Sequence, residues 1–376
     1  MAEFANRSWV EVSREAIAAN YRALKQASGA GAEIMPVVKA DAYRHGAVEV
    51  SRVLEREGVR WLAVSSVEEG AKLRDAGIAA RILVMADFLP AEREGLIEYG
   101  LTPVIHATGD IHAWNEICAR RGGPRPYHLK IDSGMGRLGT RAEAAEIAEA
   151  VNACPLARLE GLMTHFASSA DYTSPQTGEQ VERFRAVCDG LAAMGIRGEF
   201  IHLSSTIPLA YGRREAWGNL IRPGHAIYGY ISPPRGDAPA RILDVRPALT
   251  WKASILTIKD IPEGAAIGYG GMFRAPQPLR IAVLAAGYAD GIPHRLSNRG
   301  RVIAGGRFAP ILGAVSMDVT TIDVTQSPGL RVGDPVTLLG SEGAVSIDAQ
   351  QIARLAGTIS YSVLCGIGAR VQRVYV

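Results

Sequence analysis

Residues that can carry covalent or acid–base chemistry stand directly after short apolar runs. Lys39 ends such a run in PVVKADAYRHG, and His165 ends another in GLMTHF. Lys130 and Arg137 lie together in HLKIDSGMGRLG, where glycines punctuate the loop. A lysine amine condenses with aldehydes, and a lysine in this setting suits an aldehyde cofactor. We therefore interpret Lys39 as a candidate Schiff-base residue.

Hydroxyls and bare backbone amides follow two later apolar runs. IHLSST contains Ser204, Ser205 and Thr206, and IRPGHAIYG contains Arg222 and Gly224. Hydroxyl and N–H groups of this kind bind phosphate. A reactive lysine and a phosphate-binding loop together indicate pyridoxal phosphate. Taken singly, the lysine could be a surface residue, the histidine a core residue and GMGRLG a tight turn. Their shared place after apolar runs makes a functional interpretation as good as these structural ones.

The elements that must position these residues alternate between strands and helices over the first 230 residues. Segments rich in Ala, Glu, Arg and Leu separate the apolar runs. Repeated strand–helix units predict a parallel (β/α)8 barrel, whose active site lies at the carboxyl ends of the strands. In such barrels the loops after strands seven and eight commonly bind phosphate. The predicted strands are 34–38, 61–64, 82–85, 102–105, 127–131, 159–163, 199–203 and 219–221.

The pattern changes after residue 230. ISPPRGDAPA predicts a linker because it is rich in proline, glycine and aspartate. The short apolar runs beyond it, separated by Gly, Pro and Asp, predict a smaller mostly-β domain. We expect a barrel over residues 10–235 and a β-rich domain over 241–376, with residues 1–9 packing on the second. The predicted strands of that domain are 253–258, 279–284, 301–304, 309–315, 319–324 and 335–338.

Composition excludes several classes of protein. The net charge is +3 with the basic residues scattered, which argues against a nucleic-acid-binding surface. None of the four cysteines forms a C-x-x-C pair, which argues against a zinc site or a disulfide framework. No signal peptide and no membrane-spanning apolar run is visible. We expect a cytoplasmic enzyme that contacts neither membrane nor nucleic acid and binds no metal.

The motifs of the barrel segment resemble those of alanine racemases. VVKADAYRHG resembles that family's cofactor-lysine motif, which implies that Lys39 carries pyridoxal 5'-phosphate and that Tyr43 contacts its phosphate. HLKIDSGMGRLG is similar to the segment whose lysine is often carbamylated. The resemblance thus implies a modified Lys130, with Arg137 contacting cofactor and substrate.

Two further barrel motifs carry the same resemblance. EGLMTHFA is similar to the segment whose histidine stacks on the pyridine ring, which implies this role for His165. IRPGHAIYG resembles the segment whose arginine, here Arg222, faces the pyridine nitrogen. The remaining cofactor contacts that the resemblance implies are Ser205, Thr206, Gly224 and His225.

The second domain also carries motifs that resemble the family. AIGYGGMF resembles the catalytic-tyrosine segment, which implies that Tyr269 is the second base. AAGYADGIPHRLSN resembles the substrate-entrance motif and contains Tyr288, and GAVSMDVT resembles the segment whose methionine amide, here that of Met317, holds the substrate carboxylate. Tyr361 lies in a terminal segment similar to the one that reaches the phosphate. In this family the second domain of one subunit completes the site of the other, so a homodimer with shared sites is implied.

The chain departs from the family pattern at several positions. Ser205-Thr206 stands where Asn-Ser is usual, so the hydroxyl of Thr206 is kept and the contact before it is changed. None of the other departures touches the proposed chemical groups, although they can alter the pocket wall. These are Arg44 in place of glycine, His225 in place of an apolar residue, and Ala314 and Ser316 in place of arginine and cysteine.

The resemblance implies an alanine racemase that interconverts L-alanine and D-alanine by two-base transfer of the α-proton on a pyridoxal phosphate aldimine. Lys39 serves the D enantiomer and Tyr269 of the partner subunit serves the L enantiomer. A hydrogen-bond chain through His165 to Arg222 is expected to stabilise the tyrosine anion. The product would be D-alanine for cell-wall peptidoglycan.

Three alternatives stay open at this point. A decarboxylase on the same barrel generally has an acidic residue at the ring nitrogen, so Arg222 argues against it. A serine or broad-specificity amino-acid racemase is closer, although such enzymes tend to carry a secretion signal. A non-catalytic pyridoxal-phosphate-binding protein would need only the barrel, so Tyr269 and Met317 argue against it.

Overall fold

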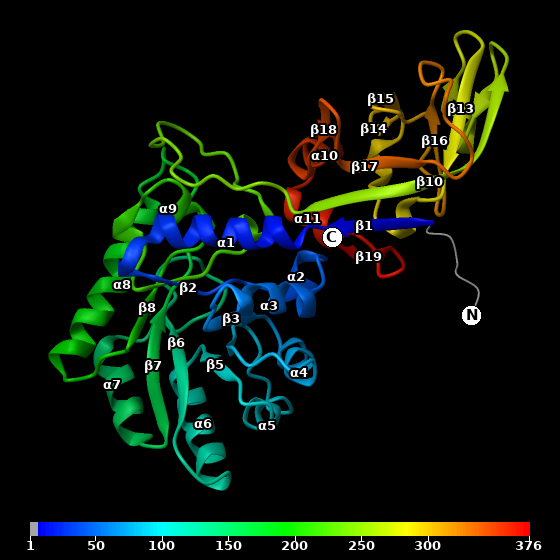
Figure 1. Ribbon diagram of the computed structural model, residues 1–376. Coiled ribbons are helices and arrows are strands. Elements are labelled where there is room, and N and C mark those ends of the chain that lie inside the picture. Colours follow the sequence, from blue (N-terminus) through cyan, green and yellow to red (C-terminus); the bar gives the residue numbers. More distant parts are fainter. Residues whose placement is uncertain (1–6) are drawn as a thin grey trace. The chain divides into compact units, whose positions relative to one another are not determined.

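The computed structural model describes residues 7–376. This part of the chain forms two compact units, which we describe separately. The first comprises Glu15–Ala42 and Ala47–Arg246. The second comprises the described part of Met1–Arg14, the short segment Tyr43–Gly46, and Pro247–Val376. Figure 1 labels most of the helices and strands of both. No helix among residues 7–376 is long and apolar enough to cross a membrane.

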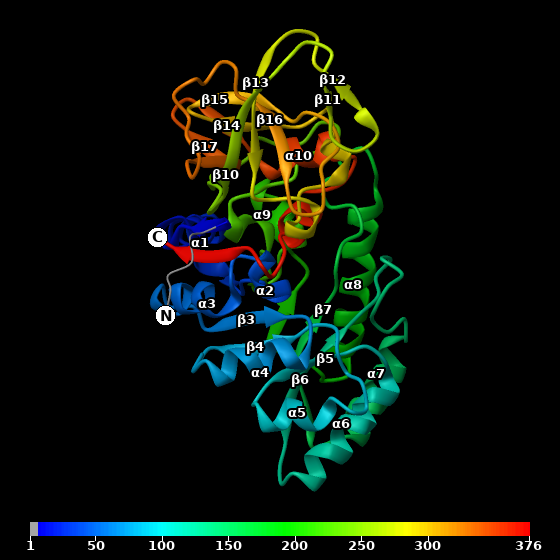
Figure 2. The same cartoon turned by 90° about the vertical axis from the view of Figure 1, so that its right-hand side faces the viewer.

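The first unit is built around parallel strands. Strands β3 to β8 pair in chain order in one sheet, and β2 pairs in parallel with β9. Figure 2 shows β3 to β7 with helices α4 to α8 on their outer side. The strands are β2 (Glu33–Ile34), β3 (Trp61–Val64), β4 (Arg81–Val84), β5 (Thr102–Ile105), β6 (Arg125–Lys130), β7 (Ala157–Met163), β8 (Phe200–His202) and β9 (Leu220–Ile221).

Isolated hydrogen bonds close these two sheets into a ring. The bridge between Val37 and Ala63 joins the segment after β2 to β3. On the other side, the N–H of Asn219 donates to the carbonyl of Ile201 at 2.9 Å and joins β9 to β8. The predicted (β/α)8 barrel is therefore confirmed. The helices are α1 (Arg14–Ser28), α3 (Ala47–Arg56), α4 (Val67–Asp75), α5 (Arg93–Glu98), α6 (Thr108–Arg120), α7 (Ala144–Ala153), α8 (Gln176–Ala193) and α9 (Thr206–Ala210).

Local sequence accounts for most of these elements. Strands β3 and β5 read WLAV and TPVI and are buried along their whole length, as expected for parallel strands covered on both faces. Helix α4 begins with a capping box in which Ser66 and Glu69 satisfy each other's backbone amides. The predicted strand 34–38 is wrong in extent: only β2 is a strand, and Val37 makes a single bridge, because Pro36 has no N–H to donate.

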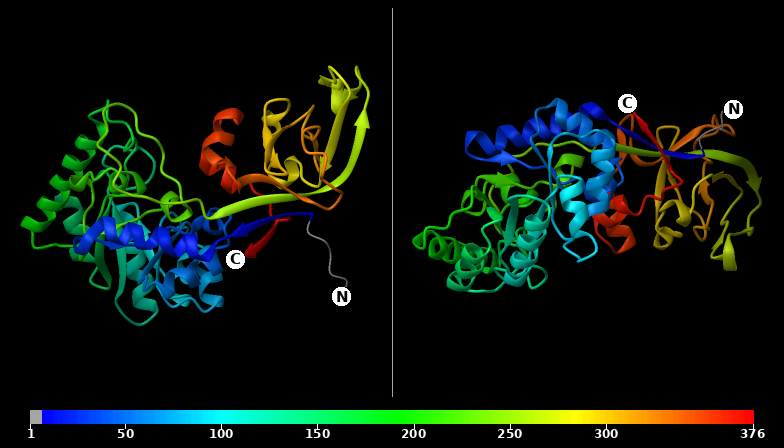
Figure 3. Two further views of the ribbon diagram at one scale, coloured as in Figure 1. Left: turned by 45° about the horizontal axis from the view of Figure 1, so that its top comes forward. Right: turned by 90° about the horizontal axis from the view of Figure 1, so that it is seen from below.

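The second unit is mostly β, as predicted. Its main sheet follows the order β15-β14-β17-β10-β1-β19, and β13, β16 and β18 pair off this path. The long strand β10 organises the unit because it pairs with β1, β13 and β17 (Figure 3). Its elements are β1 (Ser8–Val12), β10 (Leu249–Ile261), β11 (Ala266–Ile267), β12 (Phe273–Arg274), β13 (Leu279–Leu284), β14 (Arg301–Ala304), β15 (Arg307–Pro310), β16 (Thr320–Asp323), β17 (Pro335–Glu342), β18 (Val345–Ile347), α10 (Ala349–Ala356), α11 (Ser360–Cys365) and β19 (Gln372–Tyr375).

The N-terminal segment takes part in this β-rich unit. Strand β1 pairs antiparallel with β10 and parallel with β19. We expected residues 1–9 to pack on the β-rich domain. Of these, residues 1–6 lie outside the described residues. The strand predicted at 309–315 is also wrong in extent, because β15 ends at Pro310 and the chain continues into the segment that leads to Met317.

Candidate active site at the barrel mouth and its second-unit counterpart

Lys39 stands at the start of a left-handed turn. Residues 40–44 all have φ between 52° and 67°, although none of them is glycine. A non-glycine residue in this region costs roughly 1–2 kcal/mol, so the turn survives only because its surroundings fix it. Glu69 accepts a hydrogen bond from the first amide of the turn at 2.6 Å, and Asp41 accepts one from Ala47 at 2.8 Å. This arrangement places strain next to the candidate Schiff-base lysine, as is common at functional sites.

A group of cations surrounds Lys130, the last residue of β6. Its side chain is buried, and burial together with the nearby charges of Arg137 and Arg222 lowers the pKa of Lys130 to about 8. Lys39 adds to this repulsion. His165 follows β7, and its pKa falls to about 3, chiefly through burial and then through Arg222 and Lys130. The structure therefore gathers Lys39, Lys130, Arg137, His165 and Arg222 at one end of the barrel.

Asp132, two residues after Lys130, is turned toward its own loop. It accepts hydrogen bonds from the backbone amides of residues 134, 135 and 136 at 2.9–3.2 Å, and it forms an ion pair with Arg141 at 2.8 Å. Burial alone would raise the pKa of Asp132, but these contacts outweigh burial and lower it to about 2. Glycine is required at 139, where φ is +112° and a Cβ would lie 2.8 Å from the amide of Asp132. The loop that carries Arg137 is thus held by Asp132, and the site stays strongly positive.

Arg222 follows β9 and is almost completely buried. Its terminal nitrogens donate to the carbonyls of Thr164, His202 and Leu203 at 2.7, 2.6 and 3.2 Å, and to Nδ1 of His202 at 3.0 Å. Within residues 7–376 no carboxylate pairs with it and no acceptor meets its Nε–H. Burial lowers the pKa of Arg222 to about 9, which leaves it charged at neutral pH. The expected hydrogen-bond chain from His165 to Arg222 is absent from these contacts, since Arg222 bonds to Thr164 and His202 instead.

The predicted phosphate-binding residues lie at the starts of two short helical turns. Helix α9 begins at Thr206, and the hydroxyl of Ser205 before it makes no capping hydrogen bond. A 3-10 turn spans His225–Tyr228, directly after Gly224. The two are joined because Ala226 donates its N–H to the Thr206 hydroxyl at 3.3 Å. Amides at the start of such turns point toward anions, so this geometry suits a phosphate group.

Two predicted site residues of the second unit contact each other. The rings of Tyr43 and Tyr361 have their centroids 5.8 Å apart at an angle of 47°. Tyr43 is buried, and burial raises its pKa above the ordinary value of a phenol. Tyr43 therefore remains a neutral hydrogen-bond donor at any physiological pH. Both residues belong to the second unit although they are 318 positions apart in the chain.

The three other predicted residues of this unit lie on neighbouring loops. Tyr288 donates its N–H to Ser316 at 2.9 Å, directly beside Met317. Tyr269 follows Gly268, where an added Cβ would lie 3.1 Å from the amide of Ala314, on the loop that leads to Met317. The side chains of Tyr269, Tyr288 and Met317 are 77%, 45% and 52% exposed in the single chain. Exposed apolar side chains gathered in this way mark a surface that binds something else.

Acidic residues beside these loops are paired. Arg370 holds Asp290 through two hydrogen bonds of 2.7 and 3.0 Å and reaches Asp318 at 2.8 Å. Asp290 in turn accepts from the amide of Gly287, one residue before Tyr288. This network positions the segments that carry Tyr288 and Met317, and the sequence motifs did not identify Arg370.

Sequence reasoning also missed polar residues inside the barrel. His106 directly follows β5, and its pKa is lowered to about 4 by burial and by the charge of Lys130. His128, His202 and Glu160 are buried within the barrel strands. The sequence could have indicated that His128 faces the same side of its strand as Lys130, because it lies two positions before it and alternate residues of a strand point to the same face.

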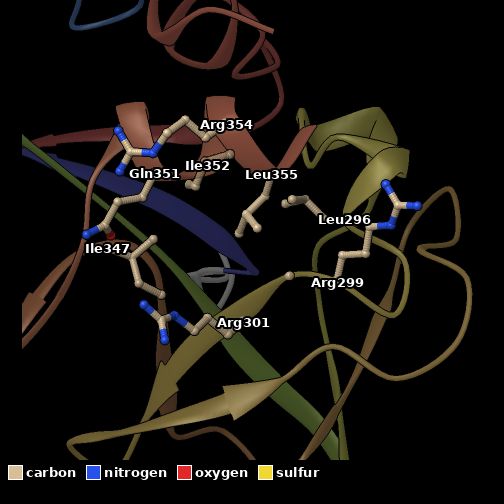
Figure 4. A pocket seen from close by; sticks show the side chains of 9 residues that line it. Leu296, Arg299, Arg301, Ile347, Gln351, Ile352, Arg354 and Leu355 are labelled. Carbon is tan, nitrogen blue, oxygen red and sulfur yellow. The ribbon is translucent and has the colours of Figure 1, made fainter. Parts of the chain in front are cut away.

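A cavity in the second unit does not coincide with the candidate site. It has a volume of about 400 Å³ and is lined by Arg299, Arg301 and Arg354 together with apolar side chains such as Leu296 and Ile352 (Figure 4). None of the predicted site residues lines it. Shape alone therefore does not locate the chemistry in this chain.

Comparison with known proteins agrees with the geometry. Residues 12–233 match the alanine racemase N-terminal domain, and residues 248–375 match the alanine racemase C-terminal domain. The alanine racemase of Halothermothrix orenii is 40% identical over 369 residues, which cover 98% of this chain and 96% of that protein.

Solved structures give the same result. The alanine racemase from Bacillus anthracis with bound L-Ala-P superposes with a TM-score of 0.90 at 31% identity, covering 100% of this chain and 96% of that one. The alanine racemase from Bartonella henselae with covalently bound pyridoxal phosphate superposes with a TM-score of 0.86 at 27% identity, covering 98% and 99%. With both of its units matched over nearly their whole length, the chain belongs to the alanine racemase family of isomerases.

Proposed function

We propose that this protein interconverts L-alanine and D-alanine with pyridoxal 5'-phosphate held at the barrel mouth. The observation that carries the proposal is the group of Lys39, Lys130, Arg137 and Arg222, whose charges act on one another at the end of the barrel where catalytic residues lie. Its natural ligands are anions, and both a phosphate ester and an amino-acid carboxylate are anionic.

The residues present fit pyridoxal phosphate. Lys39 would attach it, and the amides and hydroxyls around Ser205, Thr206 and Gly224 would hold its phosphate. The hydrogen bonds of Arg222 within residues 7–376 use its terminal nitrogens, which leaves its Nε–H to donate to a ring nitrogen. When bound, the cofactor withdraws electrons from the α-carbon of an attached amino acid and so acidifies its α-proton.

Two groups would move that proton. The amine of Lys39 removes or returns it on one face, and the phenol of Tyr269 does so on the opposite face. Tyr269 is 77% exposed in the single chain, which supports a homodimer in which Tyr269 of the partner subunit completes the site. His165 would pack against the ring as a neutral imidazole, because its pKa is lowered to about 3.

Arg222 would set the outcome of the reaction. A guanidinium whose pKa is about 9 after burial stays charged at neutral pH and donates a hydrogen bond without giving up its proton. Because Arg222 would not protonate the ring nitrogen, it would support electron withdrawal less strongly than an acidic residue at that position, and prompt return of the proton by Lys39 or Tyr269 would be favoured. This favours racemisation over transamination.

Lys130 would act as a carbamate. With a pKa of about 8, a substantial fraction of its amine is neutral near pH 7.5. The neutral amine adds to carbon dioxide, forms an N–C bond and releases one proton to solvent. The resulting anion would turn repulsion of Arg137 into attraction and hold it toward the substrate carboxylate.

Direct assay tests the proposal. Purified protein loaded with pyridoxal phosphate should convert each enantiomer of alanine into an equal mixture, measured by circular dichroism, and Lys39→Ala should abolish this conversion. Faster turnover of serine would support a serine or broad-specificity racemase instead. Binding of the cofactor without turnover of either amino acid would favour a non-catalytic binding protein. Supply of D-alanine for peptidoglycan in the cytoplasm is the proposed role of the activity.

A further inference from the structure

A row of buried polar side chains runs through the barrel from Arg222 to Glu160. His202 Nδ1 lies 3.0 Å from Arg222, His202 Nε2 lies 2.8 Å from His128 Nδ1, and His128 Nε2 lies 3.4 Å from Glu160 Oε2. The last distance is long for a hydrogen bond, so this link is mainly electrostatic. All four residues are at most 3% exposed. The row links the carboxyl end of β9 to Arg81, the first residue of β4, which pairs with Glu160 at 2.6 Å.

The chemistry of the groups determines where each proton lies. A guanidinium only donates, so His202 Nδ1 accepts from Arg222 and a neutral His202 carries its proton on Nε2. That proton points to His128 Nδ1, so a neutral His128 carries its own proton on Nε2, facing Glu160. Burial is the main cause that lowers the pKa of His128 and His202, so both rings are neutral. All donors in the row therefore point from Arg222 toward Glu160.

The rings in this row are held in place by packing. His128 stacks on Phe200 at 5.8 Å and 21° and meets the edge of Trp61 at 5.5 Å. On its other side lies Gly161, where a Cβ would come within 2.6 Å of His128 Nδ1. Glu160 occupies a β-bulge, since Tyr127 pairs with Leu159 and His128 with Gly161. A ring flip that exchanged donor and acceptor would break the row.

The charges in the row sit at its two ends. Burial would raise the pKa of Glu160, but His128 and Arg81 outweigh it and lower the pKa to about 2. No carboxylate in the described part of the chain, residues 7–376, pairs with Arg222, and a buried charge without compensation is costly. Glu160 is the carboxylate at the far end of the row: two hydrogen bonds join Arg222, His202 and His128, and an electrostatic contact of 3.4 Å joins His128 to Glu160.

We propose that Glu160 is a positioning residue for Arg222, acting through His128 and His202. The row fixes the terminal nitrogens of Arg222 and so leaves Nε–H for a ligand at the barrel mouth. This inference rests on the proposed function only in taking that ligand to be the ring nitrogen of the cofactor. It assigns a role to a residue in the middle of β7, away from the strand ends where the chemistry lies.

The positions of the protons provide a test that needs no activity. In protein labelled with ¹⁵N-histidine, His128 and His202 should both appear as neutral Nε2–H tautomers from pH 5 to pH 9. Assignment would use His128→Gln and His202→Gln. An Nδ1–H tautomer at either position, or protonation of either ring near pH 6, would overturn the proposal, because the row would then not run from Arg222 to Glu160.

Two variants, one at Glu160 and one at a residue that contacts it, test the role itself. Glu160→Gln keeps the size of the side chain but removes the charge and offers an N–H to His128, so kcat should fall about tenfold or more while KM changes little. Arg158→Gln is the control, because Arg158 contacts the other oxygen of Glu160 at 2.9 Å and is half exposed. It should stay within about twofold of wild type. Equal kcat losses in both variants would overturn the proposal.

Further measurements separate this inference from the proposed function and from simple unfolding. Glu160→Gln should also weaken pyridoxal phosphate binding and shift the His202 tautomer signal, whereas Arg158→Gln should do neither. Unchanged binding and an unchanged signal in Glu160→Gln would refute the role of Glu160. If the wild type bound the cofactor but did not racemise alanine, the proposed function would be wrong, and the tautomers and binding would still decide this inference.

Discussion

Replacing Lys130 by methionine removes a buried charge that the folded protein tolerates at a cost. The pKa of Lys130 falls from 10.5 to about 8, mainly through burial and then through Arg137 and Arg222. A depression of this size corresponds to about 3 kcal/mol of stability that is lost when the amine is protonated. The cost is fully present below pH 8, where the folded and unfolded states are both protonated. It disappears as pH rises from 8 to 10.5, because only the unfolded state still binds the proton there.

The expected result is a difference in stability that depends on pH. In buffer free of carbon dioxide, cofactor-free Lys130→Met should be more stable than wild type at pH 7 by up to about 3 kcal/mol, and the two should converge by pH 10.5. Reversible urea unfolding measures both free energies. Lys72→Met is the control, because Lys72 is exposed on α4, and it should show no such trend.

Carbon dioxide should change the stability of the wild type but not that of Lys130→Met. Bicarbonate at pH 8 should stabilise wild type, since a carbamate on Lys130 attracts Arg137 and Arg222, and it should leave Lys130→Met unchanged. If the wild type and Lys130→Met kept a constant difference from pH 7 to 10.5, the lowered pKa would be wrong. If bicarbonate had no effect on either, the carbamate would be refuted.

Three other outcomes are expected. Borohydride should fix the cofactor to Lys39, shown by peptide mass, and labelling of another lysine would contradict the assignment. Mixed dimers of Lys39→Ala and Tyr269→Phe should regain up to one working site, and no recovery despite subunit exchange would refute the shared site. Tyr269→Phe alone should still exchange the α-proton of D-alanine with deuterated water, while exchange of L-alanine falls about 10²- to 10⁴-fold. Equal exchange of both enantiomers would refute the two-base assignment. Gly161→Ala should displace His128 and destabilise the protein by about 1–3 kcal/mol, measured by urea unfolding. Gly178→Ala is the control and should not destabilise the protein, because a Cβ there would meet open space.

The barrel could be predicted because its strands are buried on both faces. Runs such as WLAV at β3 and TPVI at β5 are continuous apolar segments, and amphipathic helices separate them. The position of Lys130 at a strand end followed directly from that pattern, because chemistry collects at the carboxyl ends of barrel strands. The pairing of β1 with β10 and β19 could not be predicted, since it depends on contacts between residues more than 200 positions apart.

The left-handed turn after Lys39 could not be predicted either. Only Asp41 in ADAYR is of a type that adopts positive φ, and then as a single residue, so nothing in the sequence indicates five such residues in succession. The turn depends on tertiary contacts, such as the hydrogen bond from Ala40 to Glu69 on α4. Local propensity therefore fails at the point where the site needs an unusual backbone, which is where such failures are expected.

The charges of the barrel explain why a prediction based on residues at strand ends did not find the polar side chains in its core. Arg222, Lys130 and Lys39 lie near one another at the mouth, yet the carboxylate that the row of histidines joins to Arg222 is Glu160, inside β7 and far from any strand end. A carboxylate placed directly beside Arg222 would compete with the ligand for its Nε–H. Glu160 pairs with Arg81 and Arg158 at 2.6 and 2.9 Å, and two neutral histidines stand between it and Arg222, so that N–H stays available. His202 thus holds a terminal nitrogen of Arg222 without bringing a negative charge to the barrel mouth, and the mouth stays an anion site.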